Sequence, residues 1–105
     1  MAAPPLTPAV FHILLALADG PVHGYAIMQA AESTAGFAMG PGTIYGTLDR
    51  LERAGLVKEV AGSGDGRRRL FAIQPAGRAA LRQEARRLSR LAALVQARRI
   101  VPRES

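Results

Sequence analysis

The chain has 105 residues, 49% of them hydrophobic, which is enough for one small domain and too little for two ordinary ones. It contains no cysteine, so a disulfide framework, a thiol nucleophile and a cysteine-ligated zinc are excluded. Fourteen basic against eight acidic residues give a net charge of +6, and the dominance of arginine favours a nucleic-acid partner, although a genomic preference for arginine is an alternative explanation.

The first predicted helix runs from Pro8 to about Ala18. Thr7 suits its N-cap and Pro8 its first position, and apolar residues recur at helical spacing up to the Asp-Gly-Pro stop at 19–21. The apolar run at 10–18 is too short to span a bilayer, and the chain starts without the basic residues of a secretion signal. We therefore expect a cytoplasmic protein with no membrane partner, whose first helix belongs to the core.

A second helix is predicted over residues 23–33, and a third from Gly40 to Gly55. Glycine and proline are dense between them, at 36–42, which favours a tight turn. For the third helix, Gly40 takes the N-cap position, Pro41 suits the first turn and Gly55 supplies a left-handed stop. This order of elements predicts a helix-turn-helix.

The third helix is predicted to have an apolar side and a DNA-facing side. Ile44, Leu48 and Leu51 recur at helical spacing and form the apolar stripe. The opposite side has bare backbone at glycines near its start and arginines farther along, so it suits a phosphate-lined groove. We therefore interpret it as a recognition helix. Its candidate DNA contacts are Thr43, Tyr45, Gly46, Arg50 and Arg53, with Tyr25 of the second helix as a further candidate.

Each of these candidates has an alternative that the sequence leaves open. Arg50 and Arg53 could belong to a solvated face on which Asp49 pairs with Arg53. Thr43 could hold the N-terminal turn of its helix. The two tyrosines could be packing residues.

After the third helix the side-chain pattern changes to one that repeats every two residues, as in a β-strand. This alternation predicts strands at 56–61 and 69–74. The loop at 62–68 joins them, and three consecutive arginines crowd its end. A hairpin with a cationic tip directly after a helix-turn-helix predicts the wing of a winged helix. Arg67 and Arg68 are its candidate DNA contacts, with a solvated loop as the alternative.

A last helix is predicted from Pro75 to about Ile100. At 1.5 Å per residue it would be roughly 38 Å long, more than the remaining core can cover. Its uncovered apolar face predicts a homodimer. Arginines between 82 and 90 flank this face and are interpreted as solvated, with a site for an anionic effector or a partner as the alternative. The predicted dimer interface contains Leu81, Ala85, Leu88, Leu91, Ala92 and Val95.

Taken together, these segments resemble the PadR family of bacterial transcriptional regulators. The likeness covers almost the whole chain and lies in the order and spacing of residues 6–17, 23–27, 42–57 and 75–78. The resemblance implies a winged-helix domain, a C-terminal dimerisation helix and, usually, repression that is relieved by a small molecule or by stress. The single C-terminal helix is similar to the shorter branch of the family.

Three features depart from the pattern of that family. Gly46 stands where relatives commonly carry a larger side chain. The second wing strand reads Leu-Phe-Ala-Ile-Gln at 70–74 where relatives often have Tyr-Tyr-Arg-Leu-Thr, so it lacks two hydroxyls and one charge. The chain has no tryptophan, so the planar drugs that some relatives stack on tryptophans are not expected as ligands.

The predicted fold class is mainly α with a small β-hairpin: a winged helix-turn-helix at 1–74, followed by a C-terminal dimerisation helix and tail at 75–105. We expect a homodimeric, sequence-specific transcriptional regulator, a repressor by resemblance, that binds a palindromic operator in double-stranded DNA; a small-molecule effector is left open. The alternative is a winged-helix module that binds a protein instead of DNA. The sequence shows no carboxylate pair, activated nucleophile or phosphate loop, and His12 and His23 lack partners at ligand spacing. No enzyme activity, cofactor or metal is therefore expected.

Overall fold

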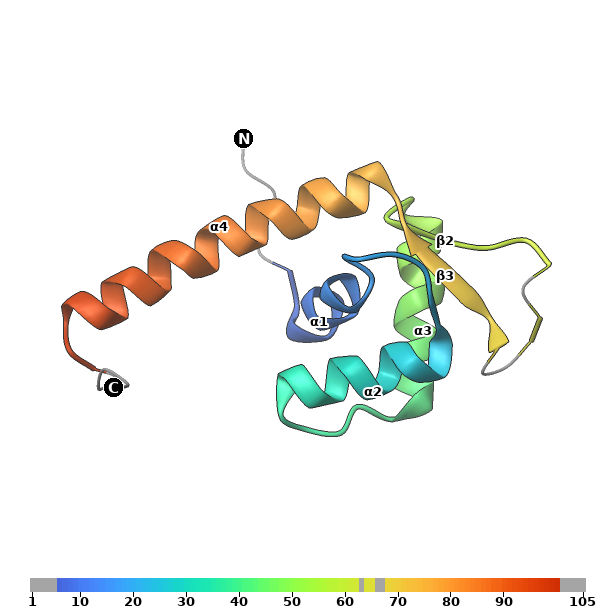
Figure 1. Ribbon diagram of the computed structural model, residues 1–105, viewed down its shortest axis with the longest axis horizontal. Coiled ribbons are helices and arrows are strands. Elements are labelled where there is room, and N and C mark those ends of the chain that lie inside the picture. Colours follow the sequence, from blue (N-terminus) through green and yellow to red (C-terminus); the bar gives the residue numbers. More distant parts are fainter. Residues whose placement is uncertain (1–5, 63, 66–67, 101–105) are drawn as a thin grey trace.

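A computed structural model of the chain describes residues 6–62, 64–65 and 68–100. Three helices pack into one body, a small sheet lies at one end of it, and a long helix passes over the body and extends beyond it (Figure 1). In chain order the elements are α1 (Pro8–Ala16), β1 (Val22–His23), α2 (Gly24–Ala35), α3 (Gly40–Arg53), β2 (Val57–Glu59), β3 (Leu70–Ile73) and α4 (Pro75–Ala97).

The core lies between α1, α2, α3 and the sheet. Thr7 begins α1 as predicted, because its side-chain oxygen accepts a hydrogen bond from the amide of Val10 at 3.3 Å and Pro8 occupies the first turn. His12 Nδ1 lies 2.7 Å from the hydroxyl of Thr34, which joins α1 to the end of α2. The predicted apolar stripe of α3 faces inward. The buried apolar residues are Ile13, Leu14, Leu17, Ile27, Ala31, Ile44, Leu48, Leu51, Val57 and Phe71.

The sheet has three strands where the sequence predicted two. β1 pairs antiparallel with β3, which pairs antiparallel with β2. Val22 lies opposite Phe71, and the amide of Gly24 donates to the carbonyl of Arg69 at 2.8 Å. A strand of two residues is too short to show an alternating pattern, so sequence reading missed it. Its last residue, His23, is also the N-cap of α2, and β1 thus ties the start of α2 to the wing.

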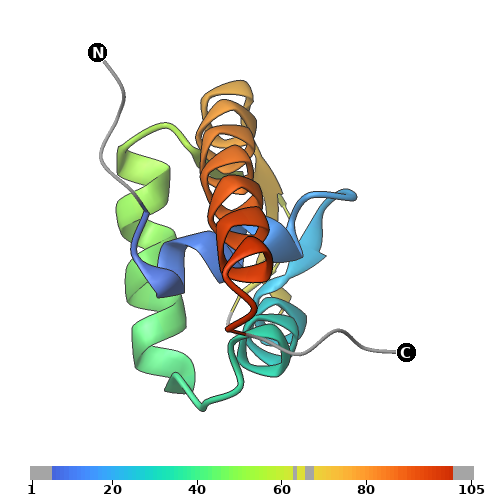
Figure 2. The same ribbon diagram turned by 90° about the vertical axis from the view of Figure 1, so that its left-hand side faces the viewer.

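The fourth helix joins the domain through its first half. It starts at Pro75 as predicted and ends at Ala97, three residues before the predicted end. A Cβ at Gly77 would collide with the carbonyl oxygen of Leu56, so this glycine permits the close approach of α4 to the body. Leu81 packs against the core, while the second half of α4 projects away from it (Figures 1 and 2).

These elements confirm the predicted class, a winged helix-turn-helix with one C-terminal helix. The division between residues 74 and 75 coincides with the start of α4, although the packing of α4 on the core does not separate two units, and the division stays a prediction. No helix in the described part of the chain combines the length and apolar character that crossing a membrane requires.

A buried carboxylate on α4 is held by an arginine of the same helix and by the start of the described chain. Glu84 is 5% exposed, and its two carboxylate oxygens accept from Nε of Arg87 at 3.0 Å and from Nη2 of Arg87 at 2.6 Å. The hydrogen bonds and charge of Arg87, together with a hydrogen bond from the backbone of Leu6, lower the pKa of Glu84 against the opposing effect of burial. The carboxylate is therefore charged at neutral pH and joins the start of the described chain to α4.

We predict that Glu84 makes the fold sensitive to acid. Because its pKa is lower in the folded chain than the unfolded value of 4.5, its charged form stabilises the fold above that value, and the contribution is lost as the pH falls through the folded pKa. Glu84→Gln should lower the melting temperature at neutral pH and flatten its decline below about pH 4.5, measured by circular dichroism. Asp19→Asn, at an exposed site, is the control and should keep the decline; an equally steep decline in Glu84→Gln would contradict the assignment.

Candidate nucleic-acid interface

The outer face of α3 is exposed and has little side chain near its start. Gly42, Thr43 and Gly46 are exposed there, and a Cβ built at either glycine would meet nothing within 4 Å. Arg50 and Arg53 are exposed farther along the helix. The structure therefore brings Thr43, Gly46, Arg50 and Arg53 together on one face, opposite the buried stripe.

The start of α3 differs from the prediction by one residue. The N-cap is Met39, not Gly40, and its side chain makes no capping hydrogen bond. Instead Oε2 of Glu32, from α2, accepts from the amides of Met39 at 2.7 Å and Gly40 at 2.9 Å. The end of the helix agrees with the prediction, because Gly55 adopts a left-handed φ of 79° after the last turn. Sequence reading missed Glu32, since its partners belong to the next helix.

The two arginines of α3 keep their charges available. Among the described residues, neither Arg50 nor Arg53 forms an ion pair. The alternative pairing of Asp49 with Arg53 is not observed there, because Asp49 pairs with Arg69 instead. Nη2 of Arg50 donates to the hydroxyl of Thr47 at 3.2 Å, which restricts the guanidinium without neutralising it.

Arg69 does not belong to the exposed cationic tip that the sequence suggested. Its side chain is 23% exposed, and Nη2 lies 3.1 Å from Asp49 of α3 and 3.0 Å from Glu59 of β2. Its guanidinium carbon also lies 5.8 Å from the ring centre of Tyr45 and 5.0 Å from that of Phe71. The hydrogen bond to Glu59 is the largest cause that raises the pKa of Arg69, which is charged at any ordinary pH. Arg69 therefore joins α3 to the wing.

The predicted tyrosine contacts occupy different settings. Tyr45 is half-buried, and its hydroxyl is buried without a hydrogen-bond partner among the described residues. Its ring lies against Gly24, where an added Cβ would come within 2.5 Å of a ring carbon. This packing favours the alternative role for Tyr45, and its contact with DNA stays a prediction. Tyr25 is 41% exposed near the start of α2.

The wing is described in part. Arg68 is exposed, and Gly64 has a left-handed φ of 109° that suits the turn beside it. Arg67 lies outside the described residues, so its predicted contact is not placed.

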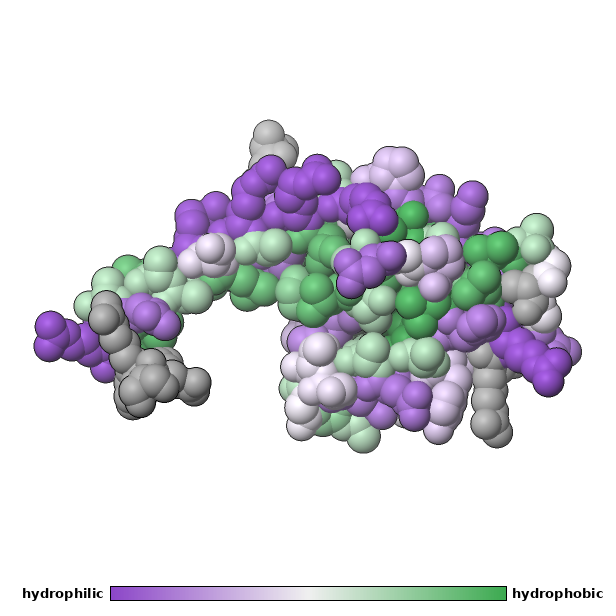
Figure 3. Space-filling model, viewed as in Figure 1, coloured by the Kyte–Doolittle hydropathy of each residue, from purple (hydrophilic) through white to green (hydrophobic). Residues whose placement is uncertain are grey.

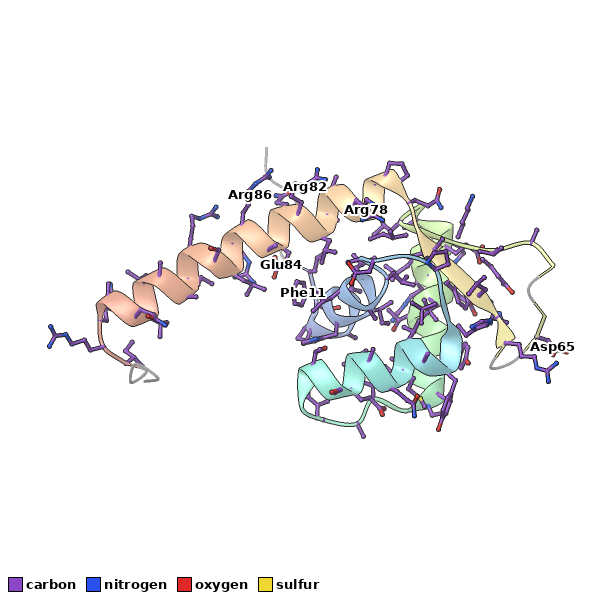
Figure 4. All side chains as sticks on the ribbon, viewed as in Figure 1. Phe11, Asp65, Arg78, Arg82, Glu84 and Arg86 are labelled. Carbon is purple, nitrogen blue, oxygen red and sulfur yellow. The ribbon has the colours of Figure 1, made fainter. Side chains whose placement is uncertain are left out.

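Most of the predicted dimer face lies on the projecting part of α4, whereas Leu81 packs against the core of its own chain. Leu88 is 37% exposed and Leu91 is 43% exposed, and Ala85 and Ala92 are also exposed, while Leu81 and Val95 are half-buried. Figure 3 shows apolar residues along the underside of this part of α4 and hydrophilic ones along its upper edge. Figure 4 places Arg82 and Arg86 on that upper edge and Glu84 on the side of the body. Arg82 and Arg86 thus point away from the predicted face, while Arg87 pairs with Glu84.

Comparison with known proteins identifies the family. The model of the transcriptional regulator PadR-like family matches residues 13–83, well over half of the chain. The chain belongs to this family. The Transcriptional regulator Rv3488 of Mycobacterium tuberculosis is 46% identical over 82 residues, which cover 77% of this chain and 76% of that protein. The resemblance read from the sequence is confirmed.

Other similar proteins are a longer relative and solved structures. An uncharacterized 37.1 kDa protein in transposon TN4556 of Streptomyces fradiae is 48% identical over 83 residues, 79% of this chain. This PadR-like chain spans only 24% of that relative's length. A PadR family transcription regulator from Clostridium difficile has the same fold, with a TM-score of 0.72 at 21% identity over 87% of this chain and 97% of that one. The complex structure of hsRosR-S4 gives a TM-score of 0.63 at 26% identity, covering 88% and 73% of the two chains.

The described side chains form no cluster that could bind a metal ion. No three histidine or acidic residues among them converge to hold an ion. Within the part of the chain that the structure describes, α3 presents a face with two exposed glycines and two arginines that have no acidic partner there, and the adjoining loop adds a basic residue.

We predict that Gly46→Ala separates stability from DNA binding. The new methyl group meets no neighbour, and alanine favours a helix over glycine by roughly 0.5–1 kcal/mol, so the variant should be more stable in urea unfolding. Its affinity for a DNA fragment selected by the wild type should fall, because the methyl group keeps the backbone away from the groove. Ser89→Ala on α4 is the control and should leave DNA affinity unchanged. Wild-type affinity in Gly46→Ala would show that this backbone does not approach DNA closely.

Proposed function

We propose that this PadR-like chain is a homodimeric, sequence-specific DNA-binding regulator that represses transcription from a palindromic operator. The observation that carries the proposal is the outer face of α3, where exposed Arg50 and Arg53 continue a surface of bare backbone at Gly42 and Gly46. No membrane partner is part of the proposal, and the protein acts in the cytoplasm where its DNA is.

The geometry of α3 suits the major groove. At 1.5 Å per residue, its 14 residues span roughly 21 Å, and the groove of B-DNA is about 12 Å wide and admits a helix. Because glycine has no side chain, the backbone at the start of the helix can approach the DNA closely, and Thr43 can reach a base edge from the same turn. Arg50 is restricted by Thr47 before DNA arrives, so less side-chain freedom is lost on binding. Arg68, with Arg67, would contact the flanking backbone or minor groove.

The second copy is proposed from the apolar face of α4. Leu88 and Leu91 remain substantially exposed in the single chain, on a helix that projects beyond its own core. Two such helices packed together would present two copies of α3, with half-sites about one helical turn, roughly 34 Å, apart. An effector could relieve repression only by binding the two arrangements of α4 with different affinities.

We predict a steep salt dependence of DNA binding. Each phosphate contact should lower the logarithm of affinity by roughly 0.9 per logarithm of salt concentration. Arg50→Ala combined with Arg68→Ala should weaken binding and reduce the slope by roughly two per protomer, measured by fluorescence anisotropy on a selected fragment. Arg82→Ala combined with Arg86→Ala, on the far side of α4, removes the same charge and should keep the slope.

Two results would contradict DNA binding through the outer face of α3. A flat salt dependence of the wild type would favour the rival function, a winged-helix module that binds a protein. If both double variants reduced the salt dependence of DNA affinity equally, net charge, and not the α3 face, would govern binding.

We predict that Leu88→Glu combined with Leu91→Glu yields a folded monomer. Both side chains are exposed in the single chain, so the protomer keeps its core, while two charges on the proposed interface would have to be buried in a dimer. Sedimentation analysis should show a dimer for the wild type and a monomer for the variant. Arg86→Glu on the opposite side of α4 should remain dimeric; a double variant that also stays dimeric would remove this face from the interface.

A further inference from the structure

The helix that is proposed to read DNA has no capping side chain of its own. Its N-cap is Met39, whose side chain makes no capping bond, and the first helical residue is Gly40. The amides of both residues donate to a single carboxylate oxygen, Oε2 of Glu32, at 2.7 and 2.9 Å. Glu32 thus does for α3, from the end of α2, what a serine or aspartate does at an ordinary N-terminus.

Little else in the turn fixes the start of α3. The turn is bounded by Gly36 and Gly40, with left-handed φ values of 81° and 79°, and glycine is the residue with the greatest backbone freedom. Phe37 is 55% exposed and Ala38 is exposed, so neither anchors the turn in the core. Only Met39, among the three residues between the glycines, packs partly against the core. The two hydrogen bonds to Glu32 therefore set the position of the first turn of α3.

The carboxylate also changes the electrostatics of that end. The amides at a helix N-terminus and the helix dipole attract phosphate. Here the hydrogen bonds from Gly40 and Met39 lower the pKa of Glu32, so the group is charged at neutral pH and occupies the first amides. A DNA phosphate at this point would meet a negative charge instead of free amides. Complexes held by phosphate contacts alone are penalised most, because they have no base contacts to compensate.

We propose that Glu32 is a positioning residue that determines specificity: it holds the first turn of α3 in place and keeps phosphates from that end, so that operator binding is favoured over binding to unrelated DNA. The inference rests on the DNA binding proposed above. The inference goes beyond the proposed DNA binding because Glu32 lies on α2 and its carboxylate contacts α3, not DNA.

The test compares two DNAs and two substitutions. The DNAs are a fragment selected by the wild type from genomic DNA and a scrambled fragment of the same length. Glu32→Ala removes the charge and both hydrogen bonds, so operator affinity should fall about tenfold, as for loss of a charge-assisted bond, while affinity for scrambled DNA rises about twofold. Glu32→Gln removes the charge but keeps an oxygen that can accept, so scrambled DNA should bind more tightly and operator affinity should fall less.

Asp19→Asn is the matched control, because it removes an exposed carboxylate from the turn after α1, next to Ala18, whose carbonyl accepts from Arg78 of α4. Its affinities for both DNAs should shift together, and the ratio between them should stay that of the wild type. Thermal melting of each variant sets a temperature at which all are folded for the measurement.

Two outcomes overturn the inference, and they differ from failure of the proposed function. An unchanged ratio in both Glu32 variants, or two affinities that rise together as in Asp19→Asn, would mean that Glu32 acts only as a surface charge. A ratio that falls equally in Glu32→Gln and Glu32→Ala would remove the positioning role. If the wild type selects no DNA at all, the proposed function itself fails and this inference fails with it.

Discussion

The surface that we propose to face DNA depends on the ion pairs of one arginine. The guanidinium of Arg69 lies between Asp49 of α3 and Glu59 of β2, at 3.1 and 3.0 Å, and beside the rings of Tyr45 and Phe71. A cation with two partners and two aromatic neighbours holds its surroundings in one arrangement, and its loss would leave two carboxylates with no counter-charge. The angle between helix and wing is therefore set inside the protomer, before any DNA is present.

The same contact explains how a helix with balanced charge can present a basic surface. α3 carries two acidic residues and two arginines. Asp49 pairs with Arg69, and Oε2 of Glu52 accepts from the amide of Glu59 at 3.0 Å, so both acids are held by partners within their own chain. Arg50 and Arg53 are left to face outward. By contrast, α4 carries five arginines against one glutamate, so the net positive charge of this helix lies away from α3, whose own charges balance. DNA recognition in this account depends on the arrangement of charges and not on their sum.

Local signals made much of the fold predictable. The cap at Thr7, the apolar stripe of α3, the stop at Gly55 and the start of α4 at Pro75 involve residues a few positions apart, and sequence reading identified each. The features it missed join residues that are distant in the chain. Glu32 caps a helix that begins eight residues later, and Arg69 reaches Asp49 across 20 positions. β1 pairs with the distant β3 and, with two residues, is too short to show an alternating pattern. The dimer and the DNA contacts stay predictions, because they concern partners outside one chain.

The central claim is that the outer face of α3 lies in the groove of DNA in each half of a dimer. The chain has no cysteine, so Thr43→Cys would carry a single thiol, at an exposed site on that face, to which a DNA-cleaving iron chelate can be attached. On a selected fragment, the labelled protein should cut at two positions about one helical turn, roughly 34 Å, apart. The same label at Arg86→Cys should cut nothing. Cleavage from the α4 label, or its absence from the α3 label while the fragment stays bound, would contradict the account.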